Sequence, residues 1–297
     1  NPTSLRVPDP GVADLLAQDA RWQAWLDVEA ALAKAEAELQ MIPGPAAEEI
    51  VRKCDLSLFD RARLTEGFQR TGHSLVPLIW ELSRLCDGDA GNYVHWGATT
   101  QNITQTGDLL QLRKVHRVFL RQIGAILAAL ADLAERSKDM ALPGRTHGQH
   151  AVPATYGLKA AVWIDEFARN VERLEQSEPR VFQAMLGGAA GTVASFGDRG
   201  LEVQARMAAH LEMPPMAVPA RNIMDHLAEH IMALALLAAS CGKFANEIYT
   251  GMKQEFGEVE EPFTAGTVGS STMPQKRNPF ISQDIMAYTA QIRTMVP

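Results

Sequence analysis

The sequence is poor in cysteine and has no long uninterrupted apolar run. Its three cysteines, Cys54, Cys86 and Cys241, stand far apart, and none belongs to a C-x-x-C pair. An odd number of isolated cysteines argues against a disulfide framework and favours a reducing compartment, so we expect a cytoplasmic protein. Ile231 to Cys241, the longest nearly uncharged apolar run, is about half of the ~20 residues that a membrane span requires. Because Asn1 to Pro10 lack a basic start followed by an apolar run, we expect neither a signal peptide nor a membrane anchor.

Positive charge is also scarce. The chain has 28 Lys and Arg against 35 Asp and Glu, a formal net charge of -7. Nucleic acids and anionic membrane surfaces are bound by clustered Lys and Arg, so this balance argues against both kinds of partner. An acidic protein can still bind an acidic substrate if the pocket itself is basic.

Helical periodicity dominates what is present. Apolar residues recur with gaps of three and four, which is typical of helices packed side by side, and no convincing alternation of period two appears. The stretches concerned are Val12–Met41, Leu112–Leu133, Ala160–Leu174, Leu227–Met252 and the shorter Ile281–Val296. We therefore predict an all-α fold, an elongated bundle of long helices with a smaller helical N-terminal domain. The predicted domains are residues 1–95 and 96–297.

Polar or glycine-rich segments interrupt these helices and are the places where chemistry is expected. They are Thr71–Ser74, His95–Asn102, Gly144–Pro153, Leu186–Gly200 and Gln254–Pro279. In the last, Gly266 and Gly269 free the backbone so that its amides can bind an anion. Lys276, Arg277 and Asn278 add positive charge and donors, and Ser270 and Ser271 add hydroxyls that such surroundings can activate. The alternative is a solvated loop with an accidental basic cluster.

The segment Gly269-Ser270-Ser271-Thr272-Met273-Pro274-Gln275-Lys276-Arg277-Asn278-Pro279 closely resembles the G-S-S-x-M-P-x-K-x-N-P signature of the fumarase/aspartase superfamily (fumarate lyases). Two further stretches, Gly97–Asn102 and Arg145–Pro153, resemble the family's first and second motifs in the same order. The sequences of these three motifs and of Gln254–Val259 are most similar to those of bacterial 3-carboxy-cis,cis-muconate cycloisomerases, and next to those of adenylosuccinate lyases.

The resemblance implies a role for each motif. Ser270 would remove the proton beside a carboxylate, and Lys276, Asn278 and the amides near Gly269 would stabilise the resulting aci-carboxylate dianion. His147 would be the general acid for the leaving group. The implied substrate-binding residues are Thr99, Thr100, Gln101, Asn102, Thr146, Gln149, Ser271, Met273, and His73 and His95, which match active-site histidines of adenylosuccinate lyases.

Two positions depart from the family pattern. The family usually has Asp where this chain has Asn102, and Asn cannot act as a base. In Asn222-Ile223-Met224-Asp225, Met224 replaces an arginine typical of both near relatives. These changes put the substrate, not the fold or the base, in question.

Two other patterns carry little weight. His226-Leu227-Ala228-Glu229-His230 reads H-x-x-E-H, a zinc-peptidase pattern, but no clear third ligand follows and the segment lies on a predicted bundle helix. Gly187–Gly191 lacks a preceding strand and a Lys-Ser/Thr pair, so we expect a tight turn or close helix approach and no nucleotide site. We expect neither a metal nor an organic cofactor.

The resemblance also implies an assembly. Members of the family are homotetramers whose active sites gather the three motifs from three subunits, so we expect the same here. The resemblance also implies that the residues given do not include the family's C-terminal helical domain. Leu227–Met252 is apolar over most of its circumference, which independently favours an obligate oligomer. Three functions stay open: a cycloisomerase acting on a tricarboxylic muconate, a C–N lyase releasing fumarate from adenylosuccinate or argininosuccinate, and a non-catalytic crystallin-like structural protein.

Overall fold

The structure, a computed structural model, describes residues 5–263 and 266–296 and divides into two compact units. The first unit comprises Asn1–Pro10, Phe119–Ser177 and Leu227–Pro297, and the second comprises Gly11–Val118 and Glu178–His226. Thr264 and Ala265, inside the predicted segment Gln254–Pro279, lie outside the described residues, as do residues 1–4 and 297. The domain boundary after residue 95 stays a prediction.

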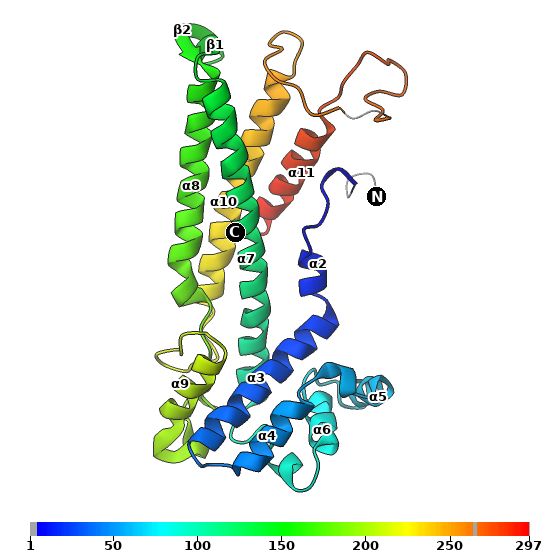
Figure 1. Cartoon of the computed structure of the whole chain (residues 1–297), viewed down its shortest axis with the longest axis vertical. Helices are drawn as coiled ribbons and strands as arrows, with labels where there is room; N and C mark the ends of the chain where they lie inside the picture. Colours follow the sequence, from blue (N-terminus) through cyan, green and yellow to red (C-terminus); the bar gives the residue numbers. More distant parts are fainter. Residues whose placement is uncertain (1–4, 264–265, 297) are drawn as a thin grey trace. The chain divides into compact units, whose positions relative to one another are not determined.

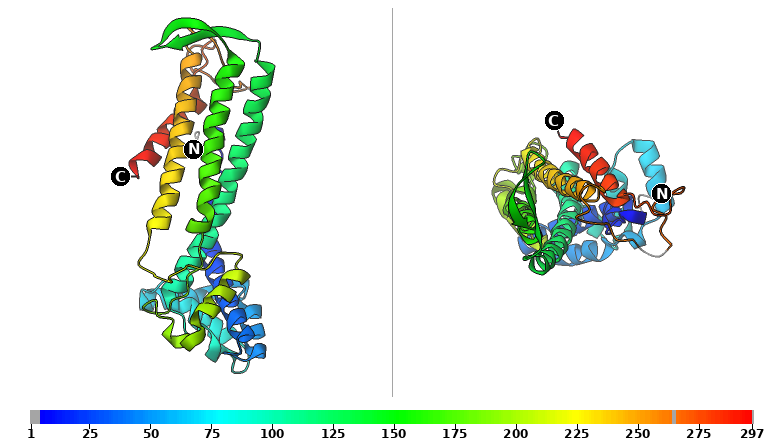
Figure 2. Two further views of the ribbon diagram at one scale, coloured as in Figure 1. Left: turned by 90° about the vertical axis from the view of Figure 1, so that its left-hand side faces the viewer. Right: turned by 90° about the horizontal axis from the view of Figure 1, so that it is seen from above.

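Long helices form the first unit. They are residues 156–177 of α8 (Tyr156–Val181), residues 227–251 of α10 (Asp225–Gly251), α11 (Phe280–Thr294) and residues 119–136 of α7 (Thr100–Arg136). Figures 1 and 2 show α8, α10 and this part of α7 side by side. The core between them contains Leu130, Phe167 and Leu174. Trp163 meets Phe244 edge to face with ring centroids 4.9 Å apart, a favourable aromatic geometry. The predicted all-α class is confirmed.

A two-stranded antiparallel hairpin, β1 (Ala141–Thr146) and β2 (Gln149–Thr155), connects α7 to α8. His147 and Gly148 form its turn with φ angles of 52° and 74°, the positive pair typical of a two-residue hairpin turn. The sequence shows no convincing period-two alternation, so these two strands within and beside Gly144–Pro153 were not predicted. Strand β2 is mostly exposed and most of β1 is partly exposed, with no buried residue in either strand, so nothing imposes the alternation that marks a half-buried strand.

The apolar character of α10 extends beyond the run Ile231–Cys241. By length and composition alone α10 is long and apolar enough to cross a membrane, and only 17% of its most apolar window is buried. Core helices of soluble proteins meet the same criteria. Ile231, Met232 and Leu236 are about half exposed, so this face has few apolar neighbours within the described chain.

The second unit is built around α3. Its α-helices are α2 (Val12–Leu15), α3 (Gln18–Glu38), α4 (Gly44–Lys53), α5 (Arg61–Thr71), α6 (Val76–Leu85), α9 (Gly200–His210) and residues 100–118 of α7; its 3-10 helices are η1 (Leu56–Leu58), η2 (Ala90–Tyr93) and η3 (Ala194–Arg199). The predicted helix Val12–Met41 is interrupted at Ala17, which is extended. Neither Leu16 nor Ala17 is a helix breaker, so the sequence gives no signal for the interruption.

Trp25 joins α3 to the start of α7. Its indole N–H donates to Asp108 at 2.9 Å, and Arg21 holds the same carboxylate through two hydrogen bonds of 2.8 and 2.6 Å while lying over the Trp25 ring. A Cβ at Gly107 would lie 2.5 Å from the Trp25 ring, so glycine permits this close approach. The anchor fixes the helix start that follows the first motif.

Candidate functional site

The signature loop, defined here as Gly269–Asn278, is closed at its base. The Asn278 side-chain amide donates to the Gly269 carbonyl at 2.9 Å. A Cβ on Gly269 would lie 2.5 Å from the Lys276 carbonyl oxygen, so only glycine lets the two arms approach so closely. One donor of Asn278, predicted to stabilise a dianion, therefore holds the loop together.

Ser270 lies inside this loop and is half-buried. Its Oγ accepts a hydrogen bond from the Met273 amide at 3.3 Å, and the Met273 carbonyl accepts from the Lys276 amide at 3.0 Å. A donor aimed at Oγ favours the alkoxide over the hydroxyl. Ser271 and the Met273 side chain are exposed.

The two basic residues of the loop have different surroundings. Arg277 pairs with Glu260 at 3.0 Å and lies over the Phe263 ring at 4.7 Å. Lys276 is exposed and makes no ion pair among residues 5–263 and 266–296. Arg277 is thus engaged in holding the loop, whereas Lys276 remains available to an anion.

The hairpin presents the second motif at its tip, where Thr146, His147 and Gln149 are all exposed. Within the described part of the chain, no group hydrogen-bonds the His147 side chain, and none links it to Ser270. In Figure 1 the hairpin and the loop that follows α10 lie at the same end of the helices of this unit. The acid and base predicted from sequence are therefore separate, unpaired groups on neighbouring segments.

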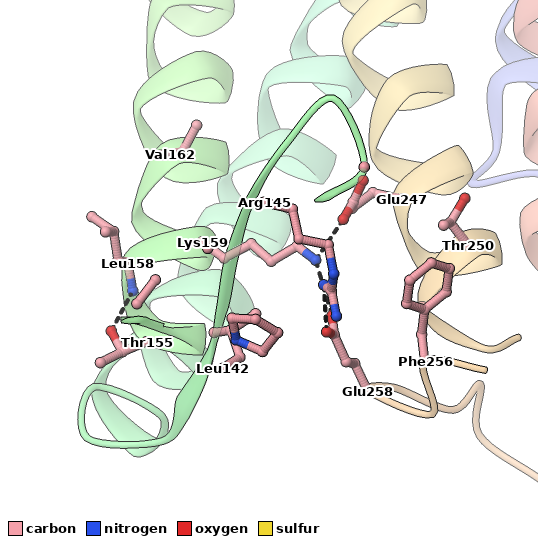
Figure 3. Close-up of a pocket in the computed structure, with 15 residues that line it drawn as sticks. Leu142, Arg145, Thr155, Leu158, Lys159, Val162, Glu247, Thr250, Phe256 and Glu258 are labelled. Carbon is pink, nitrogen blue, oxygen red and sulfur yellow. Dashed lines mark hydrogen bonds and ion pairs between the residues drawn. The ribbon is translucent and has the colours of Figure 1, made fainter. Parts of the chain in front are cut away.

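A pocket of about 410 Å³ lies beside the hairpin, between α8, α10 and the segment after α10 (Figure 3). Arg145 Nη1 lies 2.6 Å from Glu258 Oε1, and Lys159 Nζ lies 3.3 Å from Glu258 Oε2 and 2.5 Å from Glu247 Oε1. The Arg145 guanidinium also stacks over Phe256 at 4.8 Å. We call Arg145, Lys159, Glu247 and Glu258 the hairpin ion-pair cluster.

Electrostatics within this cluster favour the charged form of Glu258. Burial raises the pKa of its carboxyl, but the hydrogen bonds and charges of Arg145 and Lys159 outweigh burial and lower it overall. Nearby, burial and then the charges of Glu258 and Glu247 raise the pKa of Tyr156 to about 12. Sequence reasoning quoted Arg145 and Glu258 only as motif letters and missed their pairing, because 113 positions separate them in the chain.

The first motif lies in the second unit at the start of α7. Asn102 is fully buried, and its Oδ1 accepts from the amides of Thr99 and Gly188, each at 3.0 Å, while Nδ2 lies 3.0 Å from Met185 Sδ. Gln101 donates to the Arg221 carbonyl at 2.7 Å. Both oxygen and nitrogen of the Asn102 side chain are thus occupied by protein. Thr99 and Thr100 are partly exposed.

The two candidate histidines of the second unit are held in opposite ways. His73 Nδ1 accepts from the amides of Leu75 and Val76 at 3.1 and 3.2 Å, so the ring carries its proton on Nε2. His95 Nδ1 lies 2.6 Å from Glu29 Oε1. Burial lowers the pKa of His95, but the charge and hydrogen bond of Glu29 outweigh it and raise the pKa overall.

The remaining patterns show no ligand site. His226 and His230 are buried, and among residues 5–263 and 266–296 no group of three or more His, Cys, Asp or Glu is arranged to hold a metal ion. A Cβ at Gly187 would lie 2.3 Å from the Pro219 carbonyl, so the Gly187–Gly191 segment serves a close chain approach. Met224, at the departure from the family pattern, is 47% exposed.

These features define a class: an all-α protein whose loops present a serine within a closed glycine turn, a free lysine and an exposed histidine. The sequence matches the family described as "Lyase" over residues 6–293, so the chain belongs to this lyase family, within the fumarate lyase superfamily. The predicted resemblance is confirmed.

Two curated relatives that carry different enzyme names have nearly the same sequence identity to this chain. N-acetyl-S-(2-succino)cysteine lyase of Enterococcus italicus is 41% identical over 92% of this chain and 60% of its own length. Adenylosuccinate lyase of Methanothermobacter thermautotrophicus is 40% identical over 100% of this chain and 66% of its own length. The crystal structure of 3-carboxy-cis,cis-muconate lactonizing enzyme from Pseudomonas putida matches with a TM-score of 0.87 and 33% identity, over 97% of this chain and 64% of that one. The chain thus spans less than two thirds of the length of these proteins, and its fold is of their type.

Proposed function

We propose that the protein is an enzyme that abstracts a proton beside a carboxylate of a small di- or tricarboxylate, forming an aci-carboxylate intermediate. Ser270 acts as the base, and His147 protonates the leaving group. Lys276 provides the positive charge for the dianion, and Asn278 contributes through its remaining donor and by closing the loop. Thr99, Thr100, Gln101, Thr146 and Gln149 bind the substrate carboxylates.

The observation that carries this proposal is the closed signature loop. A serine hydroxyl is ordinarily too weak a base, and the Met273 amide directed at Ser270 Oγ lowers the cost of charge on that oxygen. Lys276, without an ion-pair partner in the described chain, supplies a charge that a bound dianion can use. A non-catalytic structural protein has no need of this arrangement, so an enzyme is favoured over a crystallin-like role.

Two substrate classes fit this step. The first is a tricarboxylic muconate, which the motif sequences favour: one of its carboxylates adds to the double bond to give the aci-carboxylate, which then takes up a proton at carbon, the reverse of the abstraction step. The second is a succinyl compound, cleaved with release of fumarate. The names of two relatives that are 40 and 41% identical support the second class and add a thioether, S-(2-succino)cysteine, to the amines expected from sequence. Ultraviolet detection of fumarate from a panel of succinyl amines and thioethers, against loss of muconate absorbance with lactone formation, separates the two.

We further propose a homotetramer, with active sites shared between subunits. The exposed apolar residues Ile231, Met232 and Leu236 on α10 support a large covered face. Such a face is buried either in a membrane or against other copies, and family membership favours copies. Light scattering that finds a stable, active monomer overturns this part of the proposal.

The test of the base is Ser270→Ala. Thr272→Ala is the matched control, since Thr272 lies two residues later in the same loop, is exposed, bears a hydroxyl and has no assigned role. We expect Ser270→Ala to lose nearly all turnover with fold and assembly intact, and Thr272→Ala to remain close to wild type. Turnover of Ser270→Ala within a few-fold of wild type contradicts the assignment.

A further inference from the structure

Glu29 on α3 is the buried partner of His95, and none of the sequence motifs contains it. Glu29 is 1% exposed, and its Oε1 lies 2.6 Å from Nδ1 of His95, which is 17% exposed. A carboxylate taken out of water is costly unless a cation or a donor compensates it. The contact therefore constrains both groups: Glu29 needs His95, and the ring of His95 is fixed through Nδ1.

The backbone around His95 fixes the ring a second time. His95 has a φ of 62°, the left-handed region that non-glycine residues seldom occupy and that clusters at functional sites. Two residues later, Gly97 also has a positive φ, and a Cβ there would lie 2.6 Å from the Phe196 ring. The turn that follows His95 is thus packed against Phe196 at Gly97.

Other titratable groups near the pair leave Glu29 as the counter-charge of His95. Glu36, two helical turns further along α3, has a pKa raised to about 9, first by burial and then by the charge of Glu29. Cys54, just after α4, has a pKa raised by burial and then by Glu29. Both groups are neutral near pH 7, so neither competes with Glu29 as the negative charge that faces His95.

His95 keeps one ring nitrogen available. Within residues 5–263 and 266–296 no protein group hydrogen-bonds its Nε2. A ring that donates from Nδ1 to a carboxylate and is protonated at Nε2 is a charge-assisted donor. His73 differs in this respect, since its Nδ1 accepts from two backbone amides.

We propose that Glu29 is the positioning residue of His95: its carboxylate holds the ring through Nδ1 and keeps Nε2–H as a charged donor to an anionic substituent of the substrate. The inference rests on the proposed function, since it requires His95 to line the active site. Glu29 itself does not touch substrate.

The test compares Glu29→Gln with Glu36→Gln, the same chemical change at two buried positions of one helix. The chain has eight histidines, so the ring signal of His95 is assigned in histidine-labelled protein by its absence from His95→Gln. In the wild type we expect His95 to titrate above the ordinary value of about 6.5. In Glu29→Gln the midpoint falls by roughly one unit or more, whereas Glu36→Gln leaves it unchanged.

Kinetics on the same variants give the second readout. With whichever substrate the panel identifies, Glu29→Gln raises KM about tenfold or more near pH 7.5, with kcat much less affected, as loss of one charge-assisted hydrogen bond predicts. Because binding uses the protonated His95 ring, KM should rise as pH increases. In Glu29→Gln this rise should occur at lower pH than in the wild type, by the same shift as the ring titration. Glu36→Gln shows neither change.

An unchanged His95 midpoint in Glu29→Gln overturns the proposal, and so does a lowered midpoint with unchanged KM. If Glu29→Gln fails to fold, the wild-type titration decides: a midpoint at or below the ordinary value overturns the proposal, and Glu29→Asp, which shortens the side chain beyond reach of Nδ1, supplies the variant arm. The ring titration does not depend on activity. Retained turnover in Ser270→Ala would therefore contradict the proposed function without bearing on the Glu29–His95 contact.

Discussion

Arg145 Nη1 and Glu258 Oε1 lie 2.6 Å apart and join the hairpin that carries His147 to the segment that leads from α10 to the signature loop. The pair is mostly screened from solvent, with side chains 20% and 13% exposed. Breaking such a pair leaves an uncompensated charge and costs more than loss of a surface ion pair. It therefore ties the predicted general acid to the chain segment bearing the predicted base.

Glu258→Gln tests this tie, with Glu247→Gln as control because Glu247 contacts Lys159 alone among these cations. We expect the amides of residues 141–155 to exchange hydrogen faster in Glu258→Gln and kcat to fall about tenfold, the scale of a misplaced acid. Glu247→Gln should show a much smaller effect on both, measured by hydrogen-exchange mass spectrometry and steady-state kinetics. Equal effects of the two variants would show that the Arg145 contact has no special role.

Gly269→Ala tests the closure of the signature loop. A Cβ 2.5 Å from the Lys276 carbonyl must push the two arms apart and displace Ser270, so we expect kcat to fall about 100-fold or more. Gly124→Ala is the control: no atom lies within 4 Å of its added Cβ in α7, and alanine should stabilise the helix by up to about 1 kcal/mol. Thermal unfolding and turnover are measured for both variants, and near-normal turnover of Gly269→Ala would contradict the proposed geometry.

Asn102→Asp tests whether the departure from the family pattern alters substrate choice. The two amides that Oδ1 accepts can be kept, but a carboxylate oxygen would then face Met185 Sδ without a donor. We expect the free energy of unfolding to fall by about 1–3 kcal/mol, with the order of preference among substrates unchanged. Denaturant titration and the substrate panel measure these, and a switched preference would mean that position 102 acts on substrate after all.

Glu36→Gln should flatten the pH dependence of stability. The pKa of Glu36 is raised from 4.5 to about 9 by burial and by Glu29, so the folded protein keeps a proton that the unfolded chain releases. The stabilisation is complete below pH 4.5 and is lost as pH rises towards about 9. Over that interval, the wild type should lose about 1.4 kcal/mol per pH unit relative to Glu36→Gln. Urea unfolding at several pH values checks this, and parallel curves would contradict it.

The long helices could be predicted from the sequence because their apolar residues recur with the period of a helix. Leu130 and Leu174 were expected on seam positions and are core residues. The hairpin was missed because neither strand buries one face, so its sequence need not alternate between apolar and polar residues. The helix break at Ala17 was missed because no helix-breaking residue marks it. The roles of Ser270 and His147 came from resemblance and stay predictions.

Pairings that depend on the folded chain were beyond the sequence. Glu29 and His95 are 66 positions apart, and nothing in the spacing of either residue marks them as partners. Asn102 was expected to bind substrate, yet its polar atoms are saturated by Thr99, Gly188 and Met185. The resemblance singled out His95 and Asn102 but not Glu29, and only the structure shows what each of these side chains touches.

The hairpin turn at His147 and Gly148 and the signature loop differ in the side chains they can accommodate. Its neighbours Thr146 and Gln149 face solvent on a thin ribbon, so replacing them disturbs little of the helical core, whereas the close approach at Gly269 tolerates no larger residue. Substitutions along the hairpin therefore leave the packing of the signature loop, which carries the proposed base, in place.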